Sequence, residues 1–382
     1  MDDLIQTMMH LIRCEITQQP FPATDREGLS EDALTELYRL SKAHDLAHLV
    51  GAALDENHWL PDGLPVTEQF RKQAMLAAYR HEQLSYELGQ IERVLEEAKL
   101  PFIPLKGAVL RQYYPQPWMR TSGDVDILVH EADLDRALGA LTDALSYRSE
   151  GRGGHDVVLW APSGVRVELH FNLIEERMSP QAERLLRDVW DHAQAEPESA
   201  RYGLTDAFFY YYHIAHMAKH FARSGCGVRP LIDLWVLRHR QSYDAEQRER
   251  LLAESGLSTF EKAAARLSEV WFSDAEPDEL TGTMQQFILR GGVYGSAENR
   301  ASTQTKKKYL RSRIFLPYSV LKEQYPVLRK HKWLLPLMQA RRWFRLLFKG
   351  KWGQLKKEAK ANDAVDEASR LKTADMMQQL GL

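Results

Sequence analysis

Cysteine is scarce in this 382-residue chain, which contains only two, Cys14 and Cys226. Two cysteines cannot build a disulfide framework, and without a CxxC pair they offer no cysteine-based metal site. Nowhere do 18 or more uncharged apolar residues run together, and the first ten residues, MDDLIQTMMH, are acidic where an export signal would be basic. These absences predict a reducing, cytoplasmic setting and no membrane-spanning segment.

Charge of both signs is plentiful but unevenly placed, with a formal net charge of -3. Residues 306–360 contain 17 Lys and Arg against two Glu, which leaves 33 basic and 51 acidic residues in the rest of the chain. Such a segment predicts an anionic partner or neutralisation of the acidic body. Because it interleaves bases with Trp and Phe, it is compatible with a peripheral membrane helix or with a helix whose aromatics pack on a core. Nucleic acid is a further candidate partner, although no specific nucleic-acid motif is present.

Apolar residues make up 44% of the chain and predict true hydrophobic cores. From residue 100 the pattern changes from helical to strand, helix, strand, helix, strand, strand, with a hairpin through Pro162-Ser163-Gly164. We read the glycine-rich EGRGGHD at 150–156 as a loop leading to this hairpin, because it lacks the Lys and Ser/Thr of a phosphate-binding P-loop. Helical periodicity predicts helices near 2–17, 30–43 (with Ser30 as the N-cap), 67–98, 204–222, 228–240 and 258–273.

These patterns predict an α+β fold in which a small mixed sheet is embedded in a largely α-helical chain. The sheet unit is short and helices surround it on both sides in the sequence. We expect four parts: an N-terminal helical region at 1–98, an α/β core at 99–178, a helical domain at 179–300 that forms the other wall of a cleft, and a basic helical region at 301–382.

Three carboxylates fall on the predicted strands. In DVDILV, Asp124 and Asp126 project from the same face, because side chains two residues apart in a strand point the same way. Glu168 lies in the later strand VRVELHF between apolar neighbours. If the two strands are adjacent, the three acids meet and can hold one or two Mg²⁺ ions, as an in-line displacement at phosphorus requires. The alternative is that Asp124 ends a turn and Glu168 is an exposed strand residue.

The segments PLKGAVL, GDVDILV and VRVELHFNL resemble the DNA polymerase β-like nucleotidyltransferase superfamily, most closely a bacterial family of uncharacterised nucleotidyltransferases. That superfamily has a glycine turn after its first strand, an Asp-hydrophobic-Asp/Glu pair on the second and a third acid on a later strand. Lys106-Gly107-Ala108 corresponds to the turn, Asp124-Val125-Asp126 to the pair and Glu168 to the third acid. Ala108 departs from the usual Gly or Ser.

The resemblance implies a nucleotidyltransferase core and an Mg²⁺-dependent transfer, with Mn²⁺ as a substitute, of a nucleoside monophosphate from an NTP such as ATP to an acceptor hydroxyl. Asp124, Asp126 and Glu168 are then the metal-binding and catalytic acids, and Gly107 lets the backbone approach the phosphates. The acceptor, which is a small molecule, a sugar or a peptide, does not follow from the sequence.

Further side chains are candidates for the same cleft. Lys106 is expected to steady the triphosphate, and Arg120 to pair with phosphate or with Asp124. His170 shares the strand face of Glu168 and is expected to line the cleft.

A histidine-rich helix is a candidate for the second wall of the cleft. His213, His216 and His220 fall on one helix face, where they are structural hydrogen-bonding residues, metal ligands or, with Arg229 and Asp233, part of that wall.

Two other functions stay open at this stage. Asp-x-Asp also binds a metal and a nucleotide-sugar diphosphate in glycosyltransferases, although about 100 helical residues precede the motif here. The second alternative is a non-catalytic binding or scaffold protein that retains the fold.

Overall fold

The computed structural model describes residues 2–21, 29–175, 178–242, 244–293, 295–303, 315–318, 321, 324–325, 327–348 and 365–382. Helices dominate this part of the chain, and five strands form one mixed sheet. The predicted α+β class is confirmed. The division into four parts stays a prediction. No helix among the described residues is both long enough and apolar enough to cross a bilayer.

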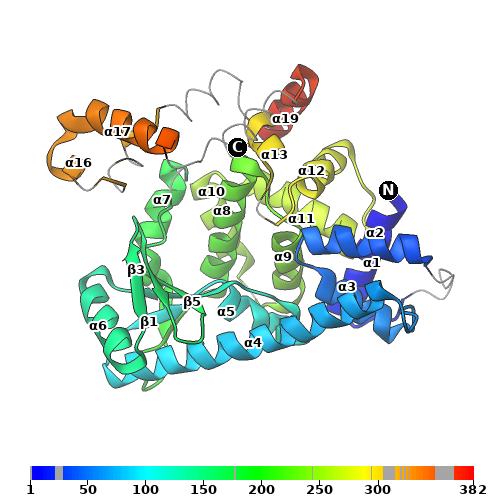
Figure 1. The fold of residues 1–382 in the computed structure, drawn as a ribbon, viewed down its shortest axis with the longest axis horizontal. Coiled ribbons are helices and arrows are strands. Elements are labelled where there is room, and N and C mark those ends of the chain that lie inside the picture. The colour runs from blue at the N-terminus through cyan, green and yellow to red at the C-terminus, as the bar shows by residue number, and fades with distance from the viewer. Residues whose placement is uncertain are drawn as a thin grey trace.

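The strands of the sheet come from one stretch of about 70 residues, and helices lie before and after it (Figure 1). The strands are β1 Phe102–Pro104, β2 Asp124–Val129, β3 Arg148–Arg152, β4 Asp156–Trp160 and β5 Arg166–His170, with a separate hairpin of β6 Ala193–Ala195 and β7 Tyr202–Leu204. The helices up to the end of the sheet are α1 Asp2–Thr17, α2 Glu31–Ala43, α3 Ala47–Glu56, α4 Pro65–Glu97, α5 Gly107–Leu110 and α6 Leu134–Leu145. Those after it are α7 Pro180–Arg187, α8 Asp206–Ser224, α9 Arg229–Arg240, α10 Ala245–Ser255, α11 Ser258–Phe272, α12 Glu279–Leu289, α13 Ala297–Ser302, α16 Val327–Lys330, α17 Leu335–Phe348 and α19 Glu367–Gln379.

The sheet has the strand order β1-β2-β5-β4-β3. β2 and β5 run parallel, and the other neighbouring pairs are antiparallel. The predicted hairpin through 162–164 joins β4 to β5. The reading of 150–156 as a loop is wrong in part, because Arg148–Arg152 forms the edge strand β3. Its sequence RSEGR is exposed throughout and has no apolar alternation, so only pairing with β4 makes it a strand.

The two faces of the sheet have different partners. Val125, Ile127 and Val129 of β2 lie in a hydrophobic core with residues of α4 and α6. The alternate residues Asp124 and Asp126 therefore project from the opposite face, which is the face directed toward the helical part of the chain. This alternation explains how charged residues fit a strand that is otherwise buried.

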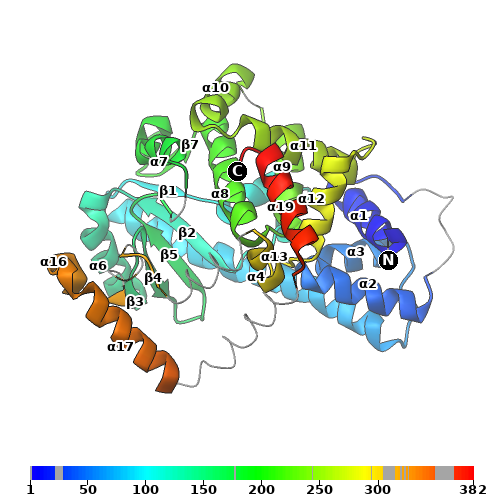
Figure 2. The same ribbon diagram turned by 90° about the horizontal axis from the view of Figure 1, so that it is seen from above.

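The 33-residue helix α4 joins the two larger hydrophobic cores that the described residues form (Figure 1). Val66 and Phe70, near its start, pack in the larger core with α1, α3 and α8 to α12. Leu84 and Ile91, farther along, pack in the core under the sheet. Figure 2 shows the sheet beside α8, with α4 passing behind both. One continuous helix thus fixes the sheet relative to the helical part.

The predicted helices are found close to their expected positions. Ser30 caps α2 as expected, since its hydroxyl accepts a hydrogen bond from the Ala33 N–H at 3.2 Å. The sequence reading missed α3, α7, α10 and α12. Ala47–Glu56 is buried over most of its surface, so α3 lacks the polar face that makes helical periodicity visible.

The predicted basic segment at 306–360 is only partly described, because 304–314 and 349–364 lie outside the described residues. Figures 1 and 2 both place α17 at the periphery of the molecule. Trp333, Leu337 and Phe344 are 76%, 59% and 62% exposed, so these three side chains do not pack on a core. A membrane or other anionic partner for this segment stays a prediction.

Candidate active site

The parallel pairing of β2 with β5 brings the predicted acids together. The register places Asp126 opposite Glu168 and Asp124 opposite Arg166. One carboxylate oxygen of Asp126, one of Glu168 and a ring nitrogen of His170 all lie within 4.8 Å of one another. Within the described ranges this is the one group of three His, Cys, Asp or Glu side chains with spacing suited to a metal ion.

Lys106 and His170 share the same oxygen of Asp126. Lys106 Nζ lies 2.8 Å from Asp126 Oδ1 and 3.9 Å from Glu168 Oε2. His170 Nε2 lies 2.9 Å from Asp126 Oδ1 and 3.4 Å from Glu168 Oε2. Asp126 and His170 are almost fully buried, so these contacts replace the water that each polar group would otherwise bind.

Asp124 lies apart from this trio, at the start of β2. Its Oδ2 accepts a hydrogen bond from Arg166 Nη1 at 3.2 Å, and the same nitrogen contacts Glu168. The guanidinium thus bridges the first and third predicted acids. The sequence reading missed Arg166, although its position two residues before Glu168 puts it on the same strand face.

The pKa values reflect this crowding. Burial, together with the charges of Asp126 and Glu168, raises the pKa of Asp124 to about 6. Burial also disfavours the Asp126 carboxylate, but Lys106 and His170 outweigh it and hold its pKa well below the ordinary value. Burial likewise disfavours the charged form of Lys106, but the negative charge of Asp126 outweighs burial and raises the pKa of Lys106. Asp126 and Lys106 are therefore an ion pair at neutral pH.

Gly107 begins α5 directly after Lys106, and its missing side chain has a steric reason. A Cβ at this position would lie 2.0 Å from Ser122 Oγ and 3.1 Å from Ser122 Cβ. The loop before β2 therefore packs against the glycine. Arg111 Nε donates a hydrogen bond of 2.8 Å to the Gly107 carbonyl and fixes the turn from the other side.

We expect Gly107→Ala to destabilise the protein by about 1–3 kcal/mol, because the new methyl group overlaps Ser122. Thermal melts should show a lower Tm, and adding Ser122→Gly to the same chain should restore most of it. Gly139→Ala on α6 is the matched control, since a Cβ there meets nothing within 4 Å. Equal Tm values for the Gly107 and Gly139 variants would contradict this packing.

Arg120 pairs with Asp233 and not with Asp124. Its Nε donates a hydrogen bond to Asp233 Oδ1 at 2.7 Å, and the Tyr114 hydroxyl donates to the same oxygen at 2.7 Å. Asp233 on α9 is 1% exposed. The option that Arg120 pairs with Asp124 is wrong, and the structure instead shows a buried ion pair that ties the loop before β2 to the helical part.

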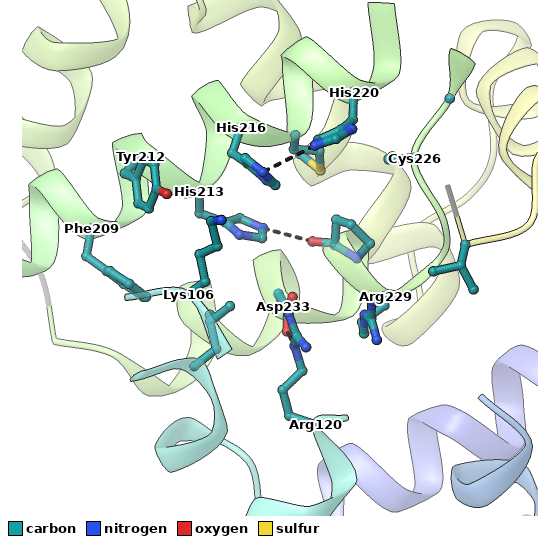
Figure 3. A pocket seen from close by; sticks show the side chains of 15 residues that line it. Lys106, Arg120, Phe209, Tyr212, His213, His216, His220, Cys226, Arg229 and Asp233 are labelled. Atoms are coloured by element: carbon teal, nitrogen blue, oxygen red, sulfur yellow. Dashed lines mark hydrogen bonds and ion pairs between the residues drawn. The ribbon is translucent and has the colours of Figure 1, made fainter. Parts of the chain in front are cut away.

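A cavity of about 140 Å³ lies between the sheet unit and the helices α8 and α9 (Figure 3). Lys106 and Arg120 line it from the side of the sheet, and Tyr212, Arg229 and Asp233 are among the residues that line it from the helices. Because Lys106 also contacts Asp126, the cavity adjoins the acid cluster. The predicted second wall, formed by α8 with Arg229 and Asp233, is therefore found next to the acids.

The three histidines of α8 also line this cavity (Figure 3). His213 Nε2 lies 3.0 Å from the Pro230 carbonyl, and His216 Nε2 lies 3.2 Å from His220 Nε2. Burial lowers the pKa of His216 well below its ordinary value and that of His220 to about 4. These imidazoles are neutral at pH 7 and hydrogen-bonded, which agrees with the structural reading of the sequence.

Comparison with known proteins identifies the family. A family model described as an uncharacterised nucleotidyltransferase matches residues 30–273, which includes the sheet, the acids and the walls of the cavity. The chain belongs to this nucleotidyltransferase family. No curated protein and no solved structure matches it. Membership agrees with the resemblance seen in the sequence and does not favour the glycosyltransferase alternative.

The geometry fits what a nucleotidyltransferase family member needs. Two carboxylates and an imidazole lie close enough together to form a donor set for a metal ion. Lys106 and Gly107 lie at the turn beside these donors. Of the predicted site residues, Lys106 and His170 each lie within 4 Å of both Asp126 and Glu168. Asp124 is linked to Glu168 through Arg166, and Arg120 lies across the cavity from the histidines.

Proposed function

We propose that this protein transfers a nucleoside monophosphate from an NTP to an acceptor hydroxyl and releases pyrophosphate. The observation that carries the proposal is the parallel register that sets Asp126 opposite Glu168, with Asp124 two residues away on the same face. Adjacent carboxylates at the end of a pocket are what a reaction at phosphorus requires, because charge develops on the transferring group and its leaving oxygen.

Asp124, Asp126, Glu168 and His170 are the residues that would hold the divalent cation. When bound, Mg²⁺ supplies positive charge for the phosphate oxygens and makes the attacking hydroxyl more acidic. In the reaction the acceptor oxygen forms a bond to the α-phosphorus, and the bond from that phosphorus to the bridging oxygen of pyrophosphate breaks. Glu168 would position the acceptor hydroxyl or take its proton.

The cavity beside Lys106 would receive the ring of one substrate. It is lined by Phe209, Tyr212 and neutral histidines, and its volume of about 140 Å³ suits a single planar group rather than a whole nucleotide. The phosphates would then lie at its mouth, where Lys106 offers a point charge and Gly107 an approachable backbone. Whether the ring is a nucleobase or part of the acceptor is open to experiment.

Calorimetric titration with non-hydrolysable ATP, CTP, GTP and UTP analogues, each with and without Mg²⁺, tests the proposal. We expect at least one analogue to bind in a Mg²⁺-dependent way and to lose this binding in the Asp124→Ala/Asp126→Ala double variant. The analogue that binds names the donor for an acceptor screen. If none of the four analogues binds, the assignment of an NTP as donor is overturned and a non-catalytic scaffold role is favoured instead.

The raised pKa of Asp124 predicts a pH-dependent metal affinity. As the pH rises through about 6, Asp124 loses its proton and the cluster gains a negative charge. Affinity for Mn²⁺ should therefore increase with pH in this range, by up to about tenfold per pH unit below pH 6. Calorimetry between pH 5 and 8 measures this, and Asp124→Asn should flatten the rise. The same slope in wild type and variant would show that Asp124 is not the titrating group.

A further inference from the structure

Lys106 is the one cavity-lining residue, within the described part of the chain, for which the structure gives an ion pair to the acid cluster. Its ammonium lies 2.8 Å from Asp126 Oδ1 and 3.9 Å from Glu168 Oε2. Arg166, the other cation of the cluster, contacts Asp124 and Glu168 but does not line the cavity. Lys106 therefore stands between the acids and the space proposed for substrate.

The backbone of Lys106 is strained in this position. Its φ of 46° and ψ of −116° are a conformation that residues other than glycine rarely adopt. Two sets of hydrogen bonds enforce it. The preceding Leu105 N–H donates to the Asp126 carbonyl at 3.0 Å, and the Lys106 carbonyl accepts from Val109 and Leu110 of α5. The base of the side chain is thus fixed beside β2, so any displacement of the ammonium has to come from rotation about the bonds of the methylene stem.

The ammonium and a divalent cation need the same oxygens. Asp126 and Glu168 supply two of the three donor atoms that fit a metal, and Lys106 Nζ is in contact with one and close to the other. Two positive ions at such separations repel each other strongly in a partly buried site. Lys106 must leave the acids, at least in part, for a divalent cation to bind them fully.

We propose that Lys106 is an exchangeable counter-ion that competes with the divalent cation for Asp126 and Glu168 and is drawn away by the phosphates of the nucleotide. This deepens the proposed function and rests on it. In the absence of nucleotide the lysine neutralises the acids and keeps cation affinity low. Phosphate oxygens at the mouth of the cavity offer the ammonium an alternative partner, so cation and nucleotide bind with positive coupling.

The test uses two separate titrations on the full chain, with Mn²⁺ alone and with a non-hydrolysable NTP in EDTA. Lys106→Met should bind Mn²⁺ about tenfold or more tightly than wild type, because a repelling charge has gone. The same variant should bind the metal-free nucleotide about tenfold more weakly, because a phosphate contact has gone. Lys99→Met removes the same charge from an exposed position and should change neither constant.

Tighter Mn²⁺ binding together with weaker nucleotide binding indicates competition. If Lys106 had only a structural role, its variants would bind both Mn²⁺ and the nucleotide more weakly. Lys106→Gln keeps a donor to Asp126 without the charge and should show the same two changes if the methionine variant folds poorly. Suppose that wild type binds Mn²⁺ and that Asp126→Asn does not. If both Lys106 variants then bind Mn²⁺ no more tightly than wild type, this inference is overturned and the proposed function is not. If wild type and Asp126→Asn are equally unable to bind Mn²⁺, both the inference and the metal site of the proposed function fail.

Discussion

Asp126→Asn is expected to reduce nucleotidyl transfer by about 10²–10³-fold, the largest effect we expect from any single change in this protein. Asp126 is 4% exposed, and its Oδ1 lies 2.8 Å from Lys106 Nζ and 2.9 Å from His170 Nε2. An amide has nearly the shape of the carboxylate but no charge, so it should remove the proposed cation site while the fold around it is kept.

Turnover of the NTP identified by calorimetry, followed as pyrophosphate release, measures this loss. Asp135→Asn on α6 makes the same chemical change at an exposed site outside the cluster and should leave the rate unchanged. Circular dichroism should confirm that both variants are folded. If Asp126→Asn keeps most of the wild-type rate, the acid cluster is not the catalytic centre.

The second large effect concerns stability and lies across the cavity. Asp233→Ala should destabilise the protein by about 3–5 kcal/mol, because it leaves the buried guanidinium of Arg120 without its carboxylate. Burial disfavours the Asp233 carboxylate, but Arg120 outweighs burial and lowers its pKa, so the pair is charged at neutral pH. The hydroxyl of Tyr114 loses its acceptor in the same variant.

Urea denaturation at pH 7 measures the change in unfolding free energy. Glu36→Gln breaks the exposed pair with Arg39 on α2 and should leave the free energy of unfolding almost unchanged, because water and salt screen an exposed pair. Combining Asp233→Leu with Arg120→Met should recover much of the loss, since two apolar groups leave no buried charge. A small effect of Asp233→Ala would mean that water reaches Arg120 and that this contact does not fix the loop before β2.

Several features of the site could be predicted because they are local. Asp124 and Asp126 share a strand face by the period of two, and the apolar residues between them face the core under the sheet. Ser30 caps its helix as a hydroxyl at a helix start should. The turn at Lys106 and Gly107 could be placed from the short strand before it, although its steric reason, the contact with Ser122, could not.

Other features could not be predicted because they join distant parts of the chain. Arg120 meets Asp233 across 113 residues, so the sequence offered no reason to prefer this partner to Asp124. The strand at Arg148–Arg152 exists only through pairing with β4, since its side chains show no alternation. The helix α3 could not be predicted for a different reason. It is buried on nearly every side, so its apolar residues do not alternate with polar ones at the helical period.

By itself the sequence determined which residues share a strand face and are therefore candidates for the site, because residue type and the alternation of a strand are local properties. The tertiary structure decided which of them meet. The parallel register of β2 and β5 sets Asp126 opposite Glu168, the strained turn holds Lys106 over both, and α8 and α9 close a cavity beside them. These contacts depend on how the sheet packs against the helices, and no local pattern encodes that packing.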